Sequence, residues 1–144
     1  METEEPAIDF QFVVDTREKT PWAMPTPVAK ALKVGDYTAV GFENIFAIER
    51  KSYDDMYQCI TTRLPHFKRQ LAKLAKLKHA YLLIEASASA FLLGHIMHKL
   101  TGQQALERLI RLTNQYNIPF CFCDRKGGEI AQQLIYRWWS DEHR

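Results

Sequence analysis

Short apolar segments alternate with amphipathic helical patterns along this chain, and that alternation limits the folds open to it. Runs rich in β-branched and aromatic residues are predicted to be buried strands at residues 10–14, 80–84 and 118–122. Helical patterns occupy residues 52–61, 65–78, 103–116 and 128–139. Because strands and helices alternate after residue 80, parallel crossover connections are expected there. The pattern predicts an α/β sandwich with a mixed central sheet flanked by helices.

Length and composition suit one compact domain. The chain has 144 residues, of which 47% are hydrophobic and 25% charged, as in ordinary soluble globular proteins. Its net charge of +2 does not by itself indicate a nucleic-acid partner, so any basic surface must be local. We expect residues 1–8, which are largely acidic and polar, to form a flexible tail, and residues 9–144 to form a single domain.

Export and membrane signals are missing from the sequence. The N-terminus has neither the basic start nor the apolar run of a signal peptide. The most apolar stretch, residues 80–97, is interrupted by Glu85 and His95 and is barely as long as a membrane span. The odd number of cysteines, three, argues against a disulfide framework. We expect a cytoplasmic protein, in a host cell or associated with the nucleoid, without membrane association.

A β-hairpin is expected between the first two core strands. Its arms are residues 37–40 and 45–51, joined by a turn at residues 41–44. Gly35, just before the first arm, gives the backbone the freedom for a tight entry.

Two segments are harder to interpret. Residues 20–33 contain three prolines, and we expect a loop with a short helix near residues 28–32. Residues 86–101 show no pattern that favours one structure, and they are left unassigned.

The second arm of this hairpin carries charged residues at strand spacing. On a strand, Glu49 and Lys51 share one face and Arg50 lies on the other. The hairpin would also bring Asp36, at the start of the first arm, next to Glu49. Two neighbouring carboxylates repel unless a proton or cation lies between them, and a hard divalent ion such as Mg²⁺ or Mn²⁺ resolves the conflict.

Such a site has a defined chemistry. The metal would polarise a phosphate oxygen and activate a bound water, and Lys51 would orient that water and neutralise charge in the transition state. This is phosphodiester hydrolysis. On spacing alone, a solvated ion pair between Glu49 and Lys51 is the competing interpretation.

Several short motifs occur in the order of a known family. They are Asp15-Thr16-Arg17-Glu18, Gly35-Asp36, Glu49-Arg50-Lys51 with Asp55, and Arg63 followed by Phe67 and Gln70. Together they resemble the nuclease domain of the XPF family, which includes the archaeal Hef nuclease. The resemblance is strongest over residues 12–85.

This resemblance implies a restriction-endonuclease-like three-layer sandwich that cuts DNA with Mg²⁺ or Mn²⁺. Asp36 and Glu49 would bind the metal, Lys51 would serve the water, and Asp15 would lie at the metal or just behind it. The remaining matched residues would support the site: Arg17, Glu18, Arg50 and Asp55. Two of these have open alternatives, since Arg50 could bind phosphate or lock the sheet and Asp55 could be half of a capping box.

A basic face is expected on the helix over residues 65–78. Its candidates for sequence-independent phosphate contacts are Lys68, Arg69, Lys73 and Lys76, together with Arg63 at the head of the helix. An ordinary solvated face is the alternative interpretation. We expect DNA as the partner, with Arg63 as the strongest candidate contact.

The family resemblance leaves biological questions open. Relatives carry a tandem helix-hairpin-helix domain after the nuclease domain, and none follows in this sequence, so a partner protein would have to supply that DNA grip. A homodimer is expected by analogy. The function expected is DNA cleavage in repair or recombination, and any preference for branched DNA stays open. Alternatives are a non-catalytic DNA-binding or dimerisation partner and a nuclease acting on RNA or on free DNA ends.

Overall fold

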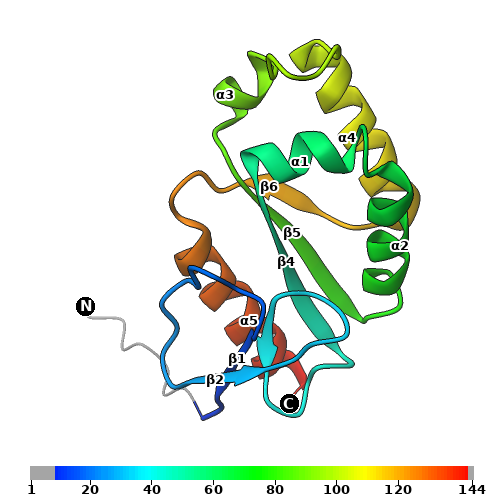
Figure 1. Cartoon of the computed structure of the whole chain (residues 1–144). Helices are drawn as coiled ribbons and strands as arrows, with labels where there is room; N and C mark the ends of the chain where they lie inside the picture. The colour runs from blue at the N-terminus through cyan, green and yellow to red at the C-terminus, as the bar shows by residue number, and fades with distance from the viewer. Residues whose placement is uncertain (1–8, 143–144) are drawn as a thin grey trace, which may run out of the picture.

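A six-stranded mixed sheet forms the centre of the computed structural model, which describes residues 9–142 (Figure 1). The strands lie in the order β2-β1-β3-β4-β5-β6. Their bounds are Phe12–Asp15 (β1), Pro27–Lys30 (β2), Tyr37–Ala39 (β3), Phe46–Ser52 (β4), His79–Glu85 (β5) and Phe120–Phe122 (β6). The expected N-terminal tail, residues 1–8, lies outside the described residues.

Strand β3 runs antiparallel to the other strands of this sheet. The two central pairs β1–β3 and β3–β4 are antiparallel, with Tyr37 opposite both Val14 and Ile48. The outer pairs β1–β2, β4–β5 and β5–β6 are parallel. The predicted hairpin and the predicted parallel crossovers after residue 80 are therefore confirmed.

Helices cover both faces of the sheet (Figure 1). Their bounds are Tyr53–Cys59 (α1), Leu64–Leu74 (α2), Ala88–Leu92 (α3), Gly102–Tyr116 (α4) and Gly127–Glu142 (α5). Helices α1 to α4 pack on one face, against β-strand residues such as Ala47 and Leu82. Helix α5 packs on the other face, against Phe46 and Ile48. The predicted three-layer α/β fold is confirmed.

Neighbouring residues of β4 thus enter different cores, as the period of two requires. Phe46 and Ile48 face α5, and Ala47 faces α1, α2 and α4. Continued along the strand, this alternation places Glu49 and Lys51 on the side of α1 and α2, and Arg50 on the side of α5. The alternation along β4 therefore separates Glu49 and Lys51 from Arg50, which lies on the opposite face of the sheet.

Local signals fix the helix ends. Ser52 caps α1 by accepting a hydrogen bond from the backbone N–H of Asp55, and Pro65 lies in the first turn of α2. Helix α4 begins with a complete capping box between Thr101 and Gln104, and it ends at Asn117 in the left-handed conformation.

The structure corrects the prediction for one segment and gives the conformation of another that the sequence leaves unassigned. The short helix expected near residues 28–32 is wrong, because Pro27–Lys30 is instead the edge strand β2, paired with β1. The unassigned residues 86–101 contain the short helix α3. No helix within residues 9–142 is long and apolar enough to span a membrane.

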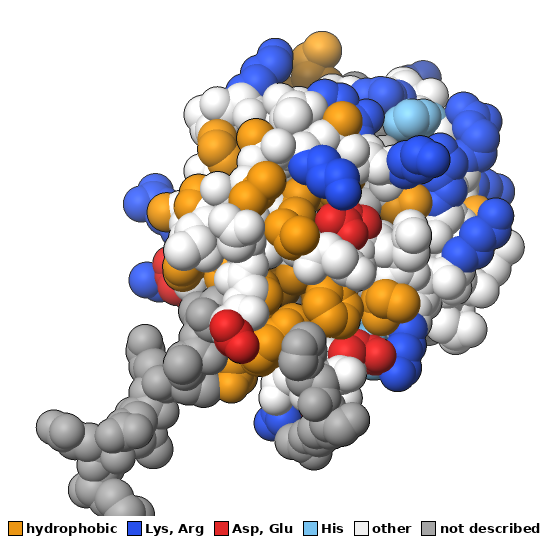
Figure 2. Space-filling view, turned by 90° about the horizontal axis from the view of Figure 1, so that it is seen from below, with side chains coloured by type: hydrophobic (Ala, Val, Ile, Leu, Met, Phe, Trp, Pro, Cys, Tyr) orange, Lys and Arg blue, Asp and Glu red, His pale blue; other side chains and the backbone are white. Residues whose placement is uncertain are grey.

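The molecular surface is divided by chemistry. In the view of Figure 2, Lys and Arg side chains crowd one part of the surface, and hydrophobic side chains gather on the adjoining part. The net charge of the chain is only +2, so this local concentration of cations is not a consequence of overall charge.

Candidate active site

The hairpin brings the carboxyl groups of Asp36 and Glu49 together. The N–H of Asp36 donates to the carbonyl oxygen of Ile48 at 2.8 Å, which extends the β3–β4 pairing by one step. In return, Oδ2 of Asp36 accepts a hydrogen bond from the N–H of Arg50 at 2.8 Å. These two bonds hold Asp36 against the end of β4, beside the buried side chain of Glu49, which is only 6% exposed.

Electrostatics at this pair are unfavourable in the absence of a cation. Burial raises the pKa of Glu49 well above its ordinary value, and the neighbouring charge of Asp36 raises it further. Burial also raises the pKa of Asp36, although the hydrogen bonds from Arg50 and Glu49 act in the opposite direction. Oε2 of Glu49 is buried and has no hydrogen-bond partner among the described residues. A buried oxygen of this kind is available to a proton or a metal ion.

Lys51 reaches the same space from the same face of β4. Its Nζ donates to Oε1 of Gln70 on α2 at 3.0 Å. The charge of Lys51 opposes the rise in the pKa of both carboxyl groups. In the sequence, Gln70 is marked only by its place in the family motif. In the structure it belongs to the site because α2 packs over β4.

Asp15 lies in the same cavity with both of its oxygens engaged. Oδ1 accepts from the N–H of Leu32 at 2.9 Å, and Oδ2 accepts from Nε of Arg17 at 2.8 Å. Arg17 in turn donates to the carbonyl oxygen of Leu32 at 2.8 Å. Asp15 is 2% exposed, and these hydrogen bonds outweigh the effect of burial so that its pKa is lowered. The arrangement favours a supporting place behind Asp36.

Arg50 points to the opposite face and forms the centre of a polar network there. It makes a two-pronged ion pair with Glu85, from Nε at 2.6 Å and from Nη2 at 3.1 Å. Its Nη1 donates to the carbonyl oxygen of Thr20 at 2.9 Å and lies 3.5 Å from Glu18. The guanidinium also stacks over the ring of Trp22, 4.4 Å from its centroid. Of the two roles left open for Arg50, this network favours locking the sheet.

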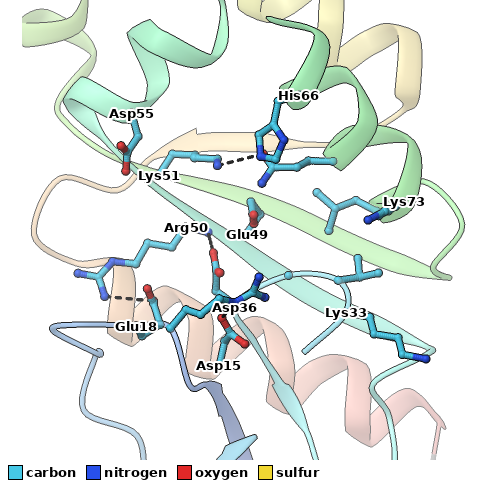
Figure 3. A pocket seen from close by; sticks show the side chains of 15 residues that line it. Asp15, Glu18, Lys33, Asp36, Glu49, Arg50, Lys51, Asp55, His66 and Lys73 are labelled. Atoms are coloured by element: carbon cyan, nitrogen blue, oxygen red, sulfur yellow. Dashed lines mark hydrogen bonds and ion pairs between the residues drawn. The ribbon is translucent and has the colours of Figure 1, made fainter. Parts of the chain in front are cut away.

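The pocket formed by these residues has a volume of about 370 Å³. Its floor holds Asp15, Asp36 and Glu49, and its walls include Glu18, Lys51 and Asp55 (Figure 3). Glu18 is half-buried, which raises its pKa. Asp55 is exposed, and its backbone N–H belongs to the Ser52 cap.

The predicted DNA contacts divide into two groups. Lys73 lines this pocket, together with two residues that the sequence did not mark, Lys33 and His66. The other members of the predicted set are exposed but do not line the pocket: Arg63, Lys68, Arg69 and Lys76.

Comparison with known proteins identifies the family. The sequence profile of the ERCC4 domain matches residues 14–126. The chain belongs to the ERCC4 domain family. This finding confirms the expected relationship to XPF nuclease domains. No curated protein sequence matches the chain.

Two solved structures have the same fold as this chain. XPF from Aeropyrum pernix superposes with a TM-score of 0.65 at 21% sequence identity, over 92% of this chain and 68% of that chain. XPF from Aeropyrum pernix in complex with DNA gives a TM-score of 0.67 at 19% identity, over 92% and 66% of the two chains. The chain thus spans about two thirds of the length of these structures.

The donor set of this ERCC4 domain can be tested against a divalent metal. Within residues 9–142, no three His, Cys, Asp or Glu side chains converge into a complete metal cluster. The site offers two carboxylates, Asp36 and Glu49, and the buried Oε2 of Glu49 lacks a partner. Mg²⁺ is commonly bound by one or two carboxylates, with water and substrate phosphate as the other ligands. The residues present therefore fit such an ion.

Proposed function

We propose that this chain is a metal-dependent DNA endonuclease that hydrolyses phosphodiester bonds. The observation that supports it is the convergence of Asp36, Glu49 and Lys51 on one pocket, with a buried carboxylate oxygen of Glu49 that has no partner among the described residues. Membership in the ERCC4 domain family supports the same function. DNA repair or recombination is the process that we propose it serves.

Each residue has a part in this proposal. Asp36 and Glu49 would hold Mg²⁺ or Mn²⁺, which supplies charge stabilisation and a water of lowered pKa. Lys51, oriented by Gln70, is placed to donate a hydrogen bond to the attacking water or to a phosphate oxygen and to offset its developing negative charge. In the reaction a water oxygen bonds to phosphorus, the bond from phosphorus to the leaving oxygen breaks, and that oxygen takes up a proton.

Asp15 and Arg50 would position the segments of the site and take no direct part in the reaction. Asp15 ties the residues after β2 to β1 through its bond to Leu32, and Arg50 ties the end of β4 to β5 through Glu85. Both hold the segments on which the carboxylates stand. This leaves the chemistry to Asp36, Glu49 and Lys51.

A cleavage assay tests the proposal. Labelled linear duplex, single-stranded, flap and fork DNA are incubated with the parent protein, Asp36→Asn and Lys51→Ala, in Mg²⁺, Mn²⁺ or EDTA. The parent is expected to cut in either metal and not in EDTA, and both variants are expected to lose activity by 100-fold or more, on the order seen when a charge-stabilising group is removed. Lys99→Ala, an exposed lysine outside the pocket, serves as the control and is expected to keep parental activity.

The same assay separates the proposal from a non-catalytic role. Cutting that persists in EDTA, or that survives both substitutions at full rate, would contradict the proposed mechanism. Binding to these DNAs without cutting in either metal would instead support the alternative of a DNA-binding partner.

A further inference from the structure

The charge distribution along α2 differs from that of the other long helices. Between Asp55 and Glu85 the chain contains no Asp or Glu, and α2 lies within that interval. Within the described part of the chain, none of the cations on α2 forms an ion pair, whereas Arg111 on α4 pairs with Glu107 at 3.4 Å and Arg137 on α5 pairs with Asp141 at 3.7 Å. The positive charge of α2 is therefore uncompensated.

This uncompensated charge reaches the mouth of the pocket. The side chains of α2 that line the pocket are His66, Gln70, Lys73 and Leu74, which recur at helical spacing. Slight desolvation and the nearby charges of Arg63, Lys51, Arg69 and Lys73 lower the pKa of His66, which shows how closely these cations gather.

A second unpaired cation lines the pocket from a different element. Lys33 lies between β2 and β3 and is exposed, and no described residue forms an ion pair with it. Figure 3 shows Lys73 on α2 and Lys33 on the β2–β3 segment on the same side of Glu49, one above the other. One end of the acidic pocket is thus bordered by two lysines from different elements.

The charge of Lys51 opposes the rise in the pKa of Asp36 and Glu49, and neither Lys33 nor Lys73 is among the largest influences on those groups. A cation that is exposed, unpaired and at the rim of an acidic pocket suits an anion that approaches from solvent. A phosphodiester backbone carries such anions at regular intervals.

We propose that Lys33 and Lys73 form a phosphate clamp at one end of the pocket, which holds the DNA backbone next to the bond to be cut. This inference rests on the proposed function and adds its substrate-binding residues. Contacts of this type fix the position of the strand and carry no sequence information. The clamp would therefore set where the DNA backbone enters the site. It also predicts that the protein binds DNA of different base sequences equally well.

Salt dependence of DNA binding tests the clamp without requiring cleavage. Affinity of the full chain for a short fluorescent duplex is measured in EDTA, between about 50 and 300 mM salt, for the parent, Lys33→Ala, Lys73→Ala and the double variant. Each lysine that contacts one phosphate accounts for a slope of about 0.9 in log K against log salt. We expect each single variant to lower the slope by about 0.9 and to weaken binding about 5- to 10-fold at 0.1 M salt.

Control variants separate specific contacts from loss of net charge. Lys73→Arg keeps the charge and is expected to keep the slope. Lys99→Ala removes an exposed lysine outside the pocket and is expected to leave the slope unchanged. Lys68 lies about 140° around α2 from Lys73 at 100° per residue, so Lys68→Ala is expected to change the slope less than Lys73→Ala.

The outcomes for the clamp and for the proposed function can be told apart. A double variant that keeps the parental slope, or a Lys99→Ala variant that loses as much as Lys73→Ala, overturns the clamp, whatever the parent does to DNA in Mg²⁺. A parent that binds DNA with a slope dependent on Lys33 and Lys73, but never cuts, supports the clamp and contradicts the nuclease proposal.

Discussion

The carboxyl group of Glu49 lies beside that of Asp36 at the open end of the β3–β4 hairpin, and burial together with the charge of Asp36 raises the pKa of Glu49 well above 4.5. Folding brings these two acidic groups together against their mutual repulsion. A site of this kind is destabilising until a cation or a proton occupies it.

Removing one of the two charges should therefore stabilise the protein in the absence of metal. Glu49→Gln has the same shape without the charge, and in EDTA at neutral pH it is expected to raise stability by about 1–2 kcal/mol. That gain corresponds to a melting temperature higher by roughly 3–8 °C.

Mg²⁺ should stabilise the parent but not the Glu49→Gln variant. Mg²⁺ is expected to raise the melting temperature of the parent and to leave that of Glu49→Gln nearly unchanged, because the variant has lost a ligand. Differential scanning fluorimetry with and without Mg²⁺ measures both effects. Glu107→Gln makes the same chemical change at an exposed position and should show neither. A parent that Mg²⁺ does not stabilise would count against a metal site at this pair.

The same pair should give stability a characteristic dependence on pH. The folded state raises the pKa of Asp36 and Glu49 above their ordinary values of 3.8 and 4.5. The folded protein therefore holds protons that the unfolded chain releases, so stability is greatest below these values and falls as pH rises through the folded pKa. Asp15, whose pKa is lowered, contributes in the opposite sense.

A difference measurement isolates the carboxyl pair from these other groups. In EDTA, the melting temperature of Glu49→Gln minus that of the parent is expected to be close to zero near pH 4 and to increase toward pH 8. The contribution of Asp15 is common to both proteins and cancels. A difference that is constant over this range would show that Glu49 does not titrate in the manner described.

Gln70 is expected to matter through the position of Lys51. Gln70→Leu removes the acceptor at 3.0 Å from Nζ of Lys51, and we expect kcat for DNA cleavage to fall about 10-fold with little change in KM. Gln70→Glu keeps an acceptor and should recover most of the rate. Gln115→Leu, at an exposed position on α4, is the matched control. Equal losses in kcat for Gln70→Leu and Gln70→Glu would contradict a role through this hydrogen bond.

Arg50 should behave as a structural residue. The Arg50 side chain is only 15% exposed. Its two-pronged bond to Glu85 and its contact with Trp22 depend on the planar guanidinium, which lysine cannot replace. Arg50→Lys is expected to lower the free energy of unfolding by about 2–4 kcal/mol, because Glu85 loses most of its partner.

Chemical denaturation measures that loss, and DNA binding by a variant without the charge distinguishes a structural role from a phosphate contact. If Arg50 locks the sheet, Arg50→Gln should also lose stability but, where it remains folded at low temperature, bind DNA with the parental salt slope. A slope reduced by about 0.9 in Arg50→Gln with unchanged stability would instead indicate a phosphate contact.

The relationship among Asp36, Glu49 and Lys51 was accessible from sequence because it depends on local geometry. The period of two along β4 decides which side chains share a face, and the short hairpin decides which residue lies opposite. Gln70 could not be assigned by the same reasoning, since its bond to Lys51 exists only because α2 packs over β4.

The edge strand β2 was missed for a related reason. Pro27–Lys30 has four residues with three of them exposed, and its sequence shows no alternation to mark a strand. Its conformation is set by pairing with β1, which is a tertiary interaction. The positions of Asp15 and Lys33 depend on the residues that follow β2. The backbone N–H of Leu32 donates to Asp15, and Lys33 is the next residue in the chain. Sequence could therefore identify Asp15 as important without showing that its oxygens are already engaged.

Gly35 offers a final test of how the fold positions Asp36. Its backbone has φ +75°, and a Cβ added there would lie 2.6 Å from Cβ of Ala47 and 3.2 Å from the carbonyl oxygen of Ile48. That carbonyl is also the acceptor for the N–H of Asp36, so relief of the clash would move the residue that holds the carboxylate. We expect Gly35→Ala to lower stability by about 2–4 kcal/mol and to weaken Mg²⁺ binding.

Gly41 provides the matched control. It also has positive φ, +88°, but a Cβ there would meet nothing within 4 Å. Gly41→Ala therefore measures the backbone strain alone, about 1–2 kcal/mol, and should leave Mg²⁺ binding unchanged. The excess loss in Gly35→Ala reports the contact between the Asp36 segment and β4, and denaturant unfolding with parallel Mg²⁺ titrations of both variants measures it. Equal losses of stability with parental Mg²⁺ affinity in both would show that this close approach does not position the carboxylate.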